Sequence, residues 1–197
     1  MEKSVDLKKT TNILINLEKA VDRLKDTKAV LDSLEVPFER FNAIEHEEGL
    51  VGCGLSHLNL LNTIKPGTVI FEDDIKCIVD PATNLLIPEE ADAVYLGVSN
   101  HGYIRNQPYG YGGVVMATQY TSQWKRVLNM CSTHAILYLS ERYIKAARDI
   151  TMKYLKSGLP FDLGLASIHK DFNILTPNDP IFYQTEQPEL TKFSLQV

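Results

Sequence analysis

The feature that most constrains the fold is a strand-like run, a helix-like stretch and a second strand-like run within residues 12–41. Residues 12–17 form a short apolar run bounded by polar residues, which is typical of a buried strand. Apolar side chains near helical spacing follow over residues 18–34 and predict an amphipathic helix. Pro37 ends that helix, and residues 38–41 alternate like a strand. This order predicts a β-α-β unit of a parallel sheet with a right-handed crossover.

Similar patterns continue along the chain. A second helix is predicted over residues 50–64, with an inward face made by Leu50, Leu55, Leu58, Leu61 and Ile64. Further strands are predicted at residues 68–71, 93–97, 114–117 and 134–139. Ser140 is placed to cap a helix that runs through Leu155. Residues 81–88 predict a connection, and the tail from about residue 176 shows little periodicity. The pattern is α/β in its first half and α+β later.

Composition fits one globular domain over residues 1–197. The chain carries a net charge of -5, which disfavours a general nucleic-acid coat because phosphate binding is built from clustered cations. It contains no apolar run of about 18 residues and no N-terminal signal-peptide pattern, so we expect a cytoplasmic protein without a membrane span. The 3 cysteines are odd in number and form no Cys-x-x-Cys, which argues against a disulfide framework and a structural zinc site.

The sharpest candidate for chemistry is the acidic triplet Glu72, Asp73 and Asp74, which directly follows the predicted strand at residues 68–71. The carboxyl ends of parallel strands open onto the crevice where α/β proteins bind ligands. Three adjacent carboxylates repel one another unless a cation or hydrogen bonds neutralise them. Mn²⁺ or Mg²⁺ prefers oxygen ligands and bridges readily to phosphate, so we expect the triplet to hold a nucleotide diphosphate through such an ion. The alternative is a solvated acidic turn or a helix cap.

Another candidate segment lies near the start of the second predicted helix. There Gly52 and Gly54 permit close backbone approach, and the helix amides attract anions. Ser56 and His57 follow directly. The alternative is a helix cap with a buried histidine, and Cys53 is expected to be a small core residue.

Asp162 follows Pro160 and Phe161, where a short helix is predicted over residues 161–170. In such a helix Asp162 and His169 lie on one face. A carboxylate placed there is able to take the proton of an acceptor hydroxyl, whereas the alternative is an N-cap. His134 precedes an apolar run, and the alternative to a functional role for it is a hydrogen-bonded core histidine.

Residues 99–113 are rich in glycine, tyrosine and asparagine. Loops of this length without regular structure are often functional lids. Tyr103, Tyr109 and Tyr111 either stack on a sugar or base or only pin their own loop.

Together these segments resemble glycosyltransferase family 25, which includes bacterial lipopolysaccharide galactosyltransferases and the collagen galactosyltransferase domain. The matching pieces occur in the family's order over roughly residues 12–185. They are INL (15–17) with Asp22 and Arg23, FERFNAI (38–44), GCGLSH (52–57), IFEDD (70–74), ADAVYLG (91–97), AILYLS (135–140) and PFD (160–162). Two departures are the short chain and Gly54, which stands where a bulkier residue is common in the family.

The resemblance implies a GT-A fold, a Rossmann-like mixed sheet flanked by helices. It implies a metal-dependent, inverting transfer of a sugar from a nucleotide-sugar, a UDP-sugar in the first place, to a hydroxyl. We accordingly divide the single domain into a nucleotide-binding half at about residues 10–98 and an acceptor-side half at about residues 99–197.

The resemblance also assigns roles to the acidic residues and their neighbours. Asp74 would contact Mn²⁺ or Mg²⁺, and Glu72 and Asp73 would contact the metal shell, the ribose or the donor sugar. The nucleotide pocket would be lined by Asn16, Leu17 and Arg23, and the floor under the donor would be shaped by Ser56 and His57.

The later residues receive the remaining roles. Asp162 is the candidate general base, with Asp73 as a second catalytic residue. His169 is a candidate metal ligand, and His134 is a candidate for a late metal or phosphate contact.

The acceptor stays open at this point. A lipopolysaccharide sugar, another glycan, a protein hydroxyl and a hydroxymethylated base in DNA all present a hydroxyl. The acidic composition argues against DNA, but a local basic patch is compatible with a negative total. Candidate residues for such a patch are Lys125, Arg126, Arg142, Lys145 and Arg148.

Two other functions also fit the sequence. One is a degenerate member of the family that binds a nucleotide-sugar or glycan without turnover. The other is a nucleotidyltransferase that makes an activated sugar. That chemistry usually needs a glycine-rich, basic loop near the N-terminus, whereas residues 16–19 after the first strand contain no glycine, so it ranks last.

Overall fold

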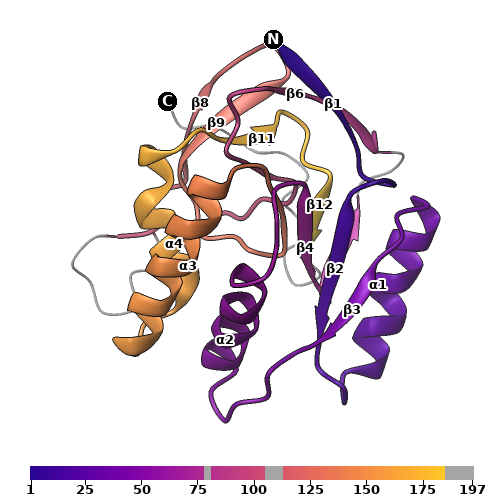
Figure 1. The fold of residues 1–197 in the computed structure, drawn as a ribbon, viewed down its shortest axis with the longest axis vertical. Coiled ribbons are helices and arrows are strands. Elements are labelled where there is room, and N and C mark those ends of the chain that lie inside the picture. Colours follow the sequence, from indigo (N-terminus) through magenta and orange to yellow (C-terminus); the bar gives the residue numbers. More distant parts are fainter. Residues whose placement is uncertain (78–80, 105–112, 185–197) are drawn as a thin grey trace.

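A computed structural model describes residues 1–77, 81–104 and 113–184, and its centre is an eight-stranded mixed sheet (Figure 1). The strands of this sheet are β2 (Thr11–Asn16), β3 (Glu39–Asn42), β4 (Thr68–Glu72), β7 (Ala93–Tyr95), β8 (Met116–Gln119), β9 (Trp124–Asn129), β10 (Ala135–Tyr138) and β11 (Ile174–Pro177). They lie in the order β3-β2-β4-β10-β7-β11-β9-β8. A mixed sheet flanked by helices agrees with the predicted α/β class.

The predicted β-α-β unit is confirmed. β2 leads into α1 (Val21–Ser33), and β3 returns beside β2 in parallel register, with Ile13 opposite Glu39 and Asn16 opposite Asn42. β4 pairs with the other edge of β2, also in parallel. The carboxyl ends of β2, β3 and β4 therefore meet at one edge of the sheet, as the sequence pattern predicts.

The middle of the sheet mixes the two predicted halves of the chain. β10 lies between β4 and β7 and is antiparallel to both, although it comes from the later half. β11 is parallel to β7, and β9 and β8 follow with antiparallel pairings. One continuous sheet thus joins residues 11–16 to residues 174–177.

Each face of the sheet has its own apolar core. Alternate residues of β4 divide between them, with Val69 and Phe71 on one face and Ile70 on the other. α1 covers the first face through Leu31. The second face is covered by α2 (Gly49–Leu61), α3 (Glu141–Lys156) and α4 (Phe161–Ile168) (Figure 1).

The inward face predicted for α2 is wrong at its start. Leu50 is 58% exposed, whereas Gly52, Gly54, Ser56 and His57 are buried. A Cβ on Gly52 would lie 2.6 Å from the carbonyl oxygen of Ile44, and one on Gly54 would lie 2.7 Å from a methyl of Leu155. The glycines therefore let neighbouring segments of the protein approach the first half of the helix, whereas Leu60 and Leu61 form its buried face at the end.

The helices of the later half begin where the sequence predicts. The Ser140 hydroxyl accepts a hydrogen bond from the Tyr143 amide, which confirms its role as the cap of α3. Close to this cap, buried Asp92 accepts hydrogen bonds from Ser140 and Arg142. α4 ends at Ile168, so the helix predicted over residues 161–170 is shorter than expected.

Several strands were not predicted from the sequence because they are short or pair with strands that are distant in the sequence. β1 (Glu2–Asp6) pairs with β6 (Asn84–Pro88), which lies in the stretch predicted to be a connection. β5 (Ile75–Cys77) pairs with β12 (Phe182–Gln184) from the tail. Among the described residues, no helix has the length and apolar character needed to cross a membrane.

Candidate functional site

A pocket of about 410 Å³ opens at the carboxyl ends of β2, β3 and β4. Its walls come from the segments that follow these strands and from the start of α2. They are formed by Ile15, Asn16, Leu17, Lys19, Arg23, Ala43, Ile44, Glu45, His46, Glu47, Gly49, Gly52, Cys53, Glu72 and Asp73. Five predicted site residues, Asn16, Leu17, Arg23, Glu72 and Asp73, are thereby brought together.

Asp73 is held from two sides. The side-chain amide of buried Asn16 donates a 2.6 Å hydrogen bond to one carboxylate oxygen, and the Arg23 guanidinium pairs with the other. Asn16 in turn accepts a 2.9 Å hydrogen bond from Arg40 Nε and donates to the carbonyl of Ala20. The carboxylate is therefore fixed at the pocket wall by residues of three successive elements.

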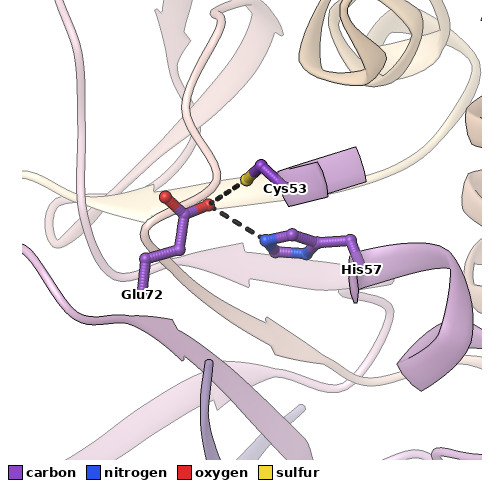
Figure 2. A group of neighbouring side chains, drawn as sticks. All are labelled: Cys53, His57 and Glu72. Carbon is purple, nitrogen blue, oxygen red and sulfur yellow. Dashed lines mark hydrogen bonds and ion pairs between the residues drawn. The ribbon is translucent and has the colours of Figure 1, made fainter. Parts of the chain in front are cut away.

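Glu72 makes a different set of contacts at the end of β4 (Figure 2). Its Oε1 lies 3.0 Å from His57 Nε2, accepts a 2.6 Å hydrogen bond from Thr133, and lies 3.9 Å from Cys53 Sγ. Burial raises the pKa of this carboxyl, but the hydrogen bonds and charge of His57 and the Thr133 hydroxyl together hold it well below its ordinary range. Glu72 is consequently a buried, ionised group.

Asp74 is the carboxylate with the least favourable surroundings. Burial, and then the neighbouring charge of Glu72, raise its pKa to about 6, although Arg23 opposes the shift. Arg23 lies 3.9 Å from its Oδ2, and the Gln184 side chain donates a 3.1 Å hydrogen bond to the same oxygen. Asp73 and Asp74 thus converge on one positive charge.

Ser56 and His57 support the pocket from beneath rather than line it. The Ser56 hydroxyl accepts a hydrogen bond from the Ile44 amide and donates to the carbonyl of Gly52, each at 2.8 Å. This pins the segment after β3 to α2, and both Ile44 and Gly52 are wall residues. His57 is fully buried and its ring packs on Phe161 at 4.7 Å between centroids.

Asp162 lies in the first turn of α4, and one carboxylate oxygen accepts a hydrogen bond from the Leu163 amide. Phe161, the residue before Asp162, packs on the ring of His57, which lies one turn of α2 after the wall residue Cys53. The structure therefore leaves Asp162 near the site, and its role as the general base stays a prediction.

His169 is a correction to the predicted metal site. Its ring is fully buried, and Nε2 lies 2.9 Å from the Tyr95 hydroxyl, which lies 3.1 Å from the Tyr143 hydroxyl. His169 directly follows α4 and begins a 3₁₀ turn. Burial lowers its pKa to about 3. It belongs to the polar interior beside α3, not to the acidic triplet.

His134 is a fully buried histidine whose Nδ1 lies 3.1 Å from the Ser132 hydroxyl. A Cβ on Gly97 would lie 1.9 Å from its Nε2, so the ring packs directly on the backbone there. Burial lowers its pKa to about 4, although the charge of Glu72 opposes the shift. The alternative of a hydrogen-bonded core histidine describes it best.

Other predicted features are placed only in part. Tyr109 and Tyr111 lie outside the described residues, and Tyr103 donates its amide to Asn129. Within the basic candidates, Arg142 is paired with buried Asp92 and Lys125 is largely buried. Because these two side chains contact buried groups or are themselves buried, they are poor candidates for a basic surface patch that binds nucleic acid.

The structure adds contacts that the sequence did not indicate. Arg40 orients Asn16, Thr133 donates to Glu72, and Gln184 reaches Asp74. Cys53 packs against the second core, as expected, and also contributes to the pocket wall. Arg40 lies inside a segment of the family resemblance. Thr133 and Gln184 reach the acidic residues only because of the pairings of β10 and β12, which no local sequence pattern predicts.

Comparisons with known proteins give limited similarity. No family model and no curated protein matches the chain. The chain is similar in structure to the CTP:phosphocholine cytidylyltransferase of Streptococcus pneumoniae, at 10% identity and a TM-score of 0.39 over 88% of this chain and 92% of that one. It is also similar to a nucleoside-diphosphate-sugar pyrophosphorylase of Vibrio cholerae RC9, at 14% identity and a TM-score of 0.38 over 84% and 72%. Similarity at this level assigns no activity to the chain.

Proposed function

We propose that this chain is a metal-dependent glycosyltransferase of the GT-A type that moves a sugar from a nucleotide-sugar to a hydroxyl. The observation that carries the proposal is the acidic triplet at the end of β4, beside a pocket that collects the ends of β2 and β3. The ordered motifs resembling glycosyltransferase family 25 support the same reading. A pocket at the carboxyl ends of neighbouring parallel strands, here β2, β3 and β4, is where α/β folds bind ligands.

The donor would bind with its nucleotide against the end of β2. Asn16 and Leu17 line that wall, and Arg23 and Lys19 supply positive charge for a diphosphate. Arg23 is 55% exposed at its side chain, so it is able to turn from the carboxylates toward an anion. The donor class we favour is a UDP-sugar.

The acidic residues fit a hard divalent cation. Asp73 and Asp74 already converge on the guanidinium of Arg23, and burial followed by the charge of Glu72 raises the pKa of Asp74. Their oxygens are the donors that Mn²⁺ and Mg²⁺ prefer, with Glu72 in the surrounding shell. A bound ion supplies charge stabilisation for the nucleoside diphosphate as it leaves.

The reaction needs one displacement at the anomeric carbon. The acceptor oxygen forms the new bond to that carbon, the bond to the diphosphate oxygen breaks, and the configuration inverts. The acceptor proton goes to a base, for which Asp162 is our candidate because it follows Phe161, whose ring packs on His57 below the pocket wall. A glycan, a protein hydroxyl and a modified nucleobase remain the acceptor classes to be tested.

The deciding experiment is a transfer assay with the full chain, a panel of UDP-sugars, Mn²⁺ and acceptors of the three classes. We expect a metal-dependent glycosylated product with release of the nucleoside diphosphate. Donor binding without product for any acceptor would favour the degenerate binding protein. Release of pyrophosphate from a sugar phosphate and a nucleoside triphosphate would instead identify a nucleotidyltransferase and overturn the proposal.

A further inference from the structure

Three side chains with different donor atoms gather beside one another (Figure 2). Cys53 and His57 are four residues apart on α2, so they project from one face of the helix. Glu72 reaches them from the end of β4. The sulfur, the imidazole Nε2 and a carboxylate oxygen all lie within 4.8 Å of one another.

The two distances from Glu72 to Cys53 and His57 are close to those between ligands of a tetrahedral ion. Ordinary zinc bond lengths give separations of about 3.5 Å between sulfur and oxygen ligands and about 3.3 Å between nitrogen and oxygen ligands. The corresponding distances here are 3.9 Å for Cys53 to Glu72 and 3.0 Å for His57 to Glu72. Movements of a few tenths of an ångström would bring these two pairs to the ideal values.

Burial and access also suit an ion with one open position. His57 is fully buried and fixed by Phe161, and the Glu72 side chain is only 15% exposed. Cys53 and Glu72 both line the pocket. Three protein ligands with a fourth position facing a cavity is the arrangement of an open zinc site rather than a closed structural one.

The chemistry of the donors selects the class of ion. A thiolate and an imidazole favour Zn²⁺ and Co²⁺, whereas Mg²⁺ and Mn²⁺ favour oxygen alone. We propose that Cys53 Sγ, His57 Nε2 and Glu72 form a site for a borderline divalent cation, Zn²⁺ above all, with its open position in the pocket. Binding exchanges the Cys53 thiol proton for the metal, and that proton leaves to solvent. This site is separate from the Asp73–Asp74 cation proposed above, and it does not rest on the proposed function.

Cobalt is the probe that reports the sulfur directly. Titrating the metal-free full chain with Co²⁺ should produce a near-ultraviolet thiolate-to-cobalt absorption band that saturates at one equivalent, and excess Zn²⁺ should remove it. Cys53→Ser should abolish the band. Loss of an outer-shell partner alone weakens metal binding by about 10–100-fold. His57→Gln removes a ligand of the metal itself, so we expect it to weaken Co²⁺ binding at least as much.

Two control variants test whether the absorption band depends specifically on Cys53. Cys77→Ser removes a half-buried thiol in β5, and Asp74→Asn removes an oxygen ligand of the other proposed cation; both should retain the band. Far-ultraviolet circular dichroism checks that Cys53→Ser remains folded. No band in the parent chain, or a band that survives Cys53→Ser, would overturn the proposal and leave Glu72 as a hydrogen-bonded partner of the thiol and imidazole.

Discussion

At the scale of single residues, Asn16 is the structural centre of the candidate site. Its buried side chain joins Asp73, Arg40 and the carbonyl of Ala20. Asn42 occupies the matching register position at the end of β3 but is exposed. Substituting Asn16 and Asn42 in turn therefore distinguishes the effect of losing a buried polar network from the effect of losing an asparagine side chain.

We predict that Asn16→Ala destabilises the protein by about 1–3 kcal/mol because it leaves the buried Asp73 carboxylate without its amide partner. Asn42→Ala should change the free energy of unfolding by less than about 0.5 kcal/mol. Urea denaturation of both variants measures the difference. Equal stability of the two variants would show that the Asn16 network contributes nothing.

A second residue-scale prediction concerns Asp162. Asp162→Asn should leave donor affinity unchanged and lower the transfer rate by about 100-fold or more, because the acceptor hydroxyl loses its base. Asp171→Asn, at an exposed position after α4, serves as the control and should be fully active. Single-turnover kinetics with calorimetric donor binding separates rate from affinity. A fully active Asp162→Asn protein would move the base to another residue.

At the scale of elements, the sequence predicted β2, α1, β3 and β4 because their apolar patterns are local. It was wrong at the start of the inner face of α2, where Leu50 is exposed and glycine, serine and histidine are buried, whereas Leu61 is buried as predicted. Close approach to Ile44 and Leu155 is a property of the packed molecule, and no pattern within the helix encodes it.

Alanine substitutions at two glycines of α2 should change the free energy of unfolding in opposite directions. Gly52→Ala places a Cβ 2.6 Å from the backbone oxygen of Ile44, so we expect a loss of about 1–3 kcal/mol in unfolding free energy. Gly49→Ala meets nothing within 4 Å, and it should stabilise the protein by about 0.4–1 kcal/mol by restricting the unfolded chain. Parallel denaturation curves test both. A stabilising Gly52→Ala would contradict the packing described for the segment after β3.

At the scale of the whole molecule, long-range pairing decides what the sequence could not predict. The family resemblance implied that the acidic triplet and the end of β2 contribute to one donor site, and the structure places them at the same edge of the sheet. Thr133 and Gln184 join them only because β10 inserts between β4 and β7 and because β12 pairs with β5. His169 was expected at the same site, but its 3₁₀ turn leads it into the interior instead.

The buried histidines predict how stability depends on pH. Burial lowers the pKa of His169 to about 3, whereas its ordinary value is 6.5, so the unfolded chain binds its proton more tightly than the folded one. The contribution of neutral His169 to the free energy of unfolding is fully present above pH 6.5 and is lost as the pH falls toward 3. His169→Gln should reduce that acid sensitivity. Unfolding free energies measured between pH 7 and pH 4 for both proteins provide the test, and identical slopes would contradict it.

The pocket is proposed to bind a nucleotide-sugar through a cation held by Asp74. Thermal unfolding with nucleotide diphosphates and nucleotide-sugars, each with and without Mn²⁺, tests this binding. A ligand that binds only the native state adds about 2.7 kcal/mol at a hundredfold excess over its dissociation constant. We predict a rise in midpoint that needs both Mn²⁺ and one nucleotide class and is absent in Asp74→Asn. No rise with any ligand, or the same rise in Asp74→Asn, would contradict the claim.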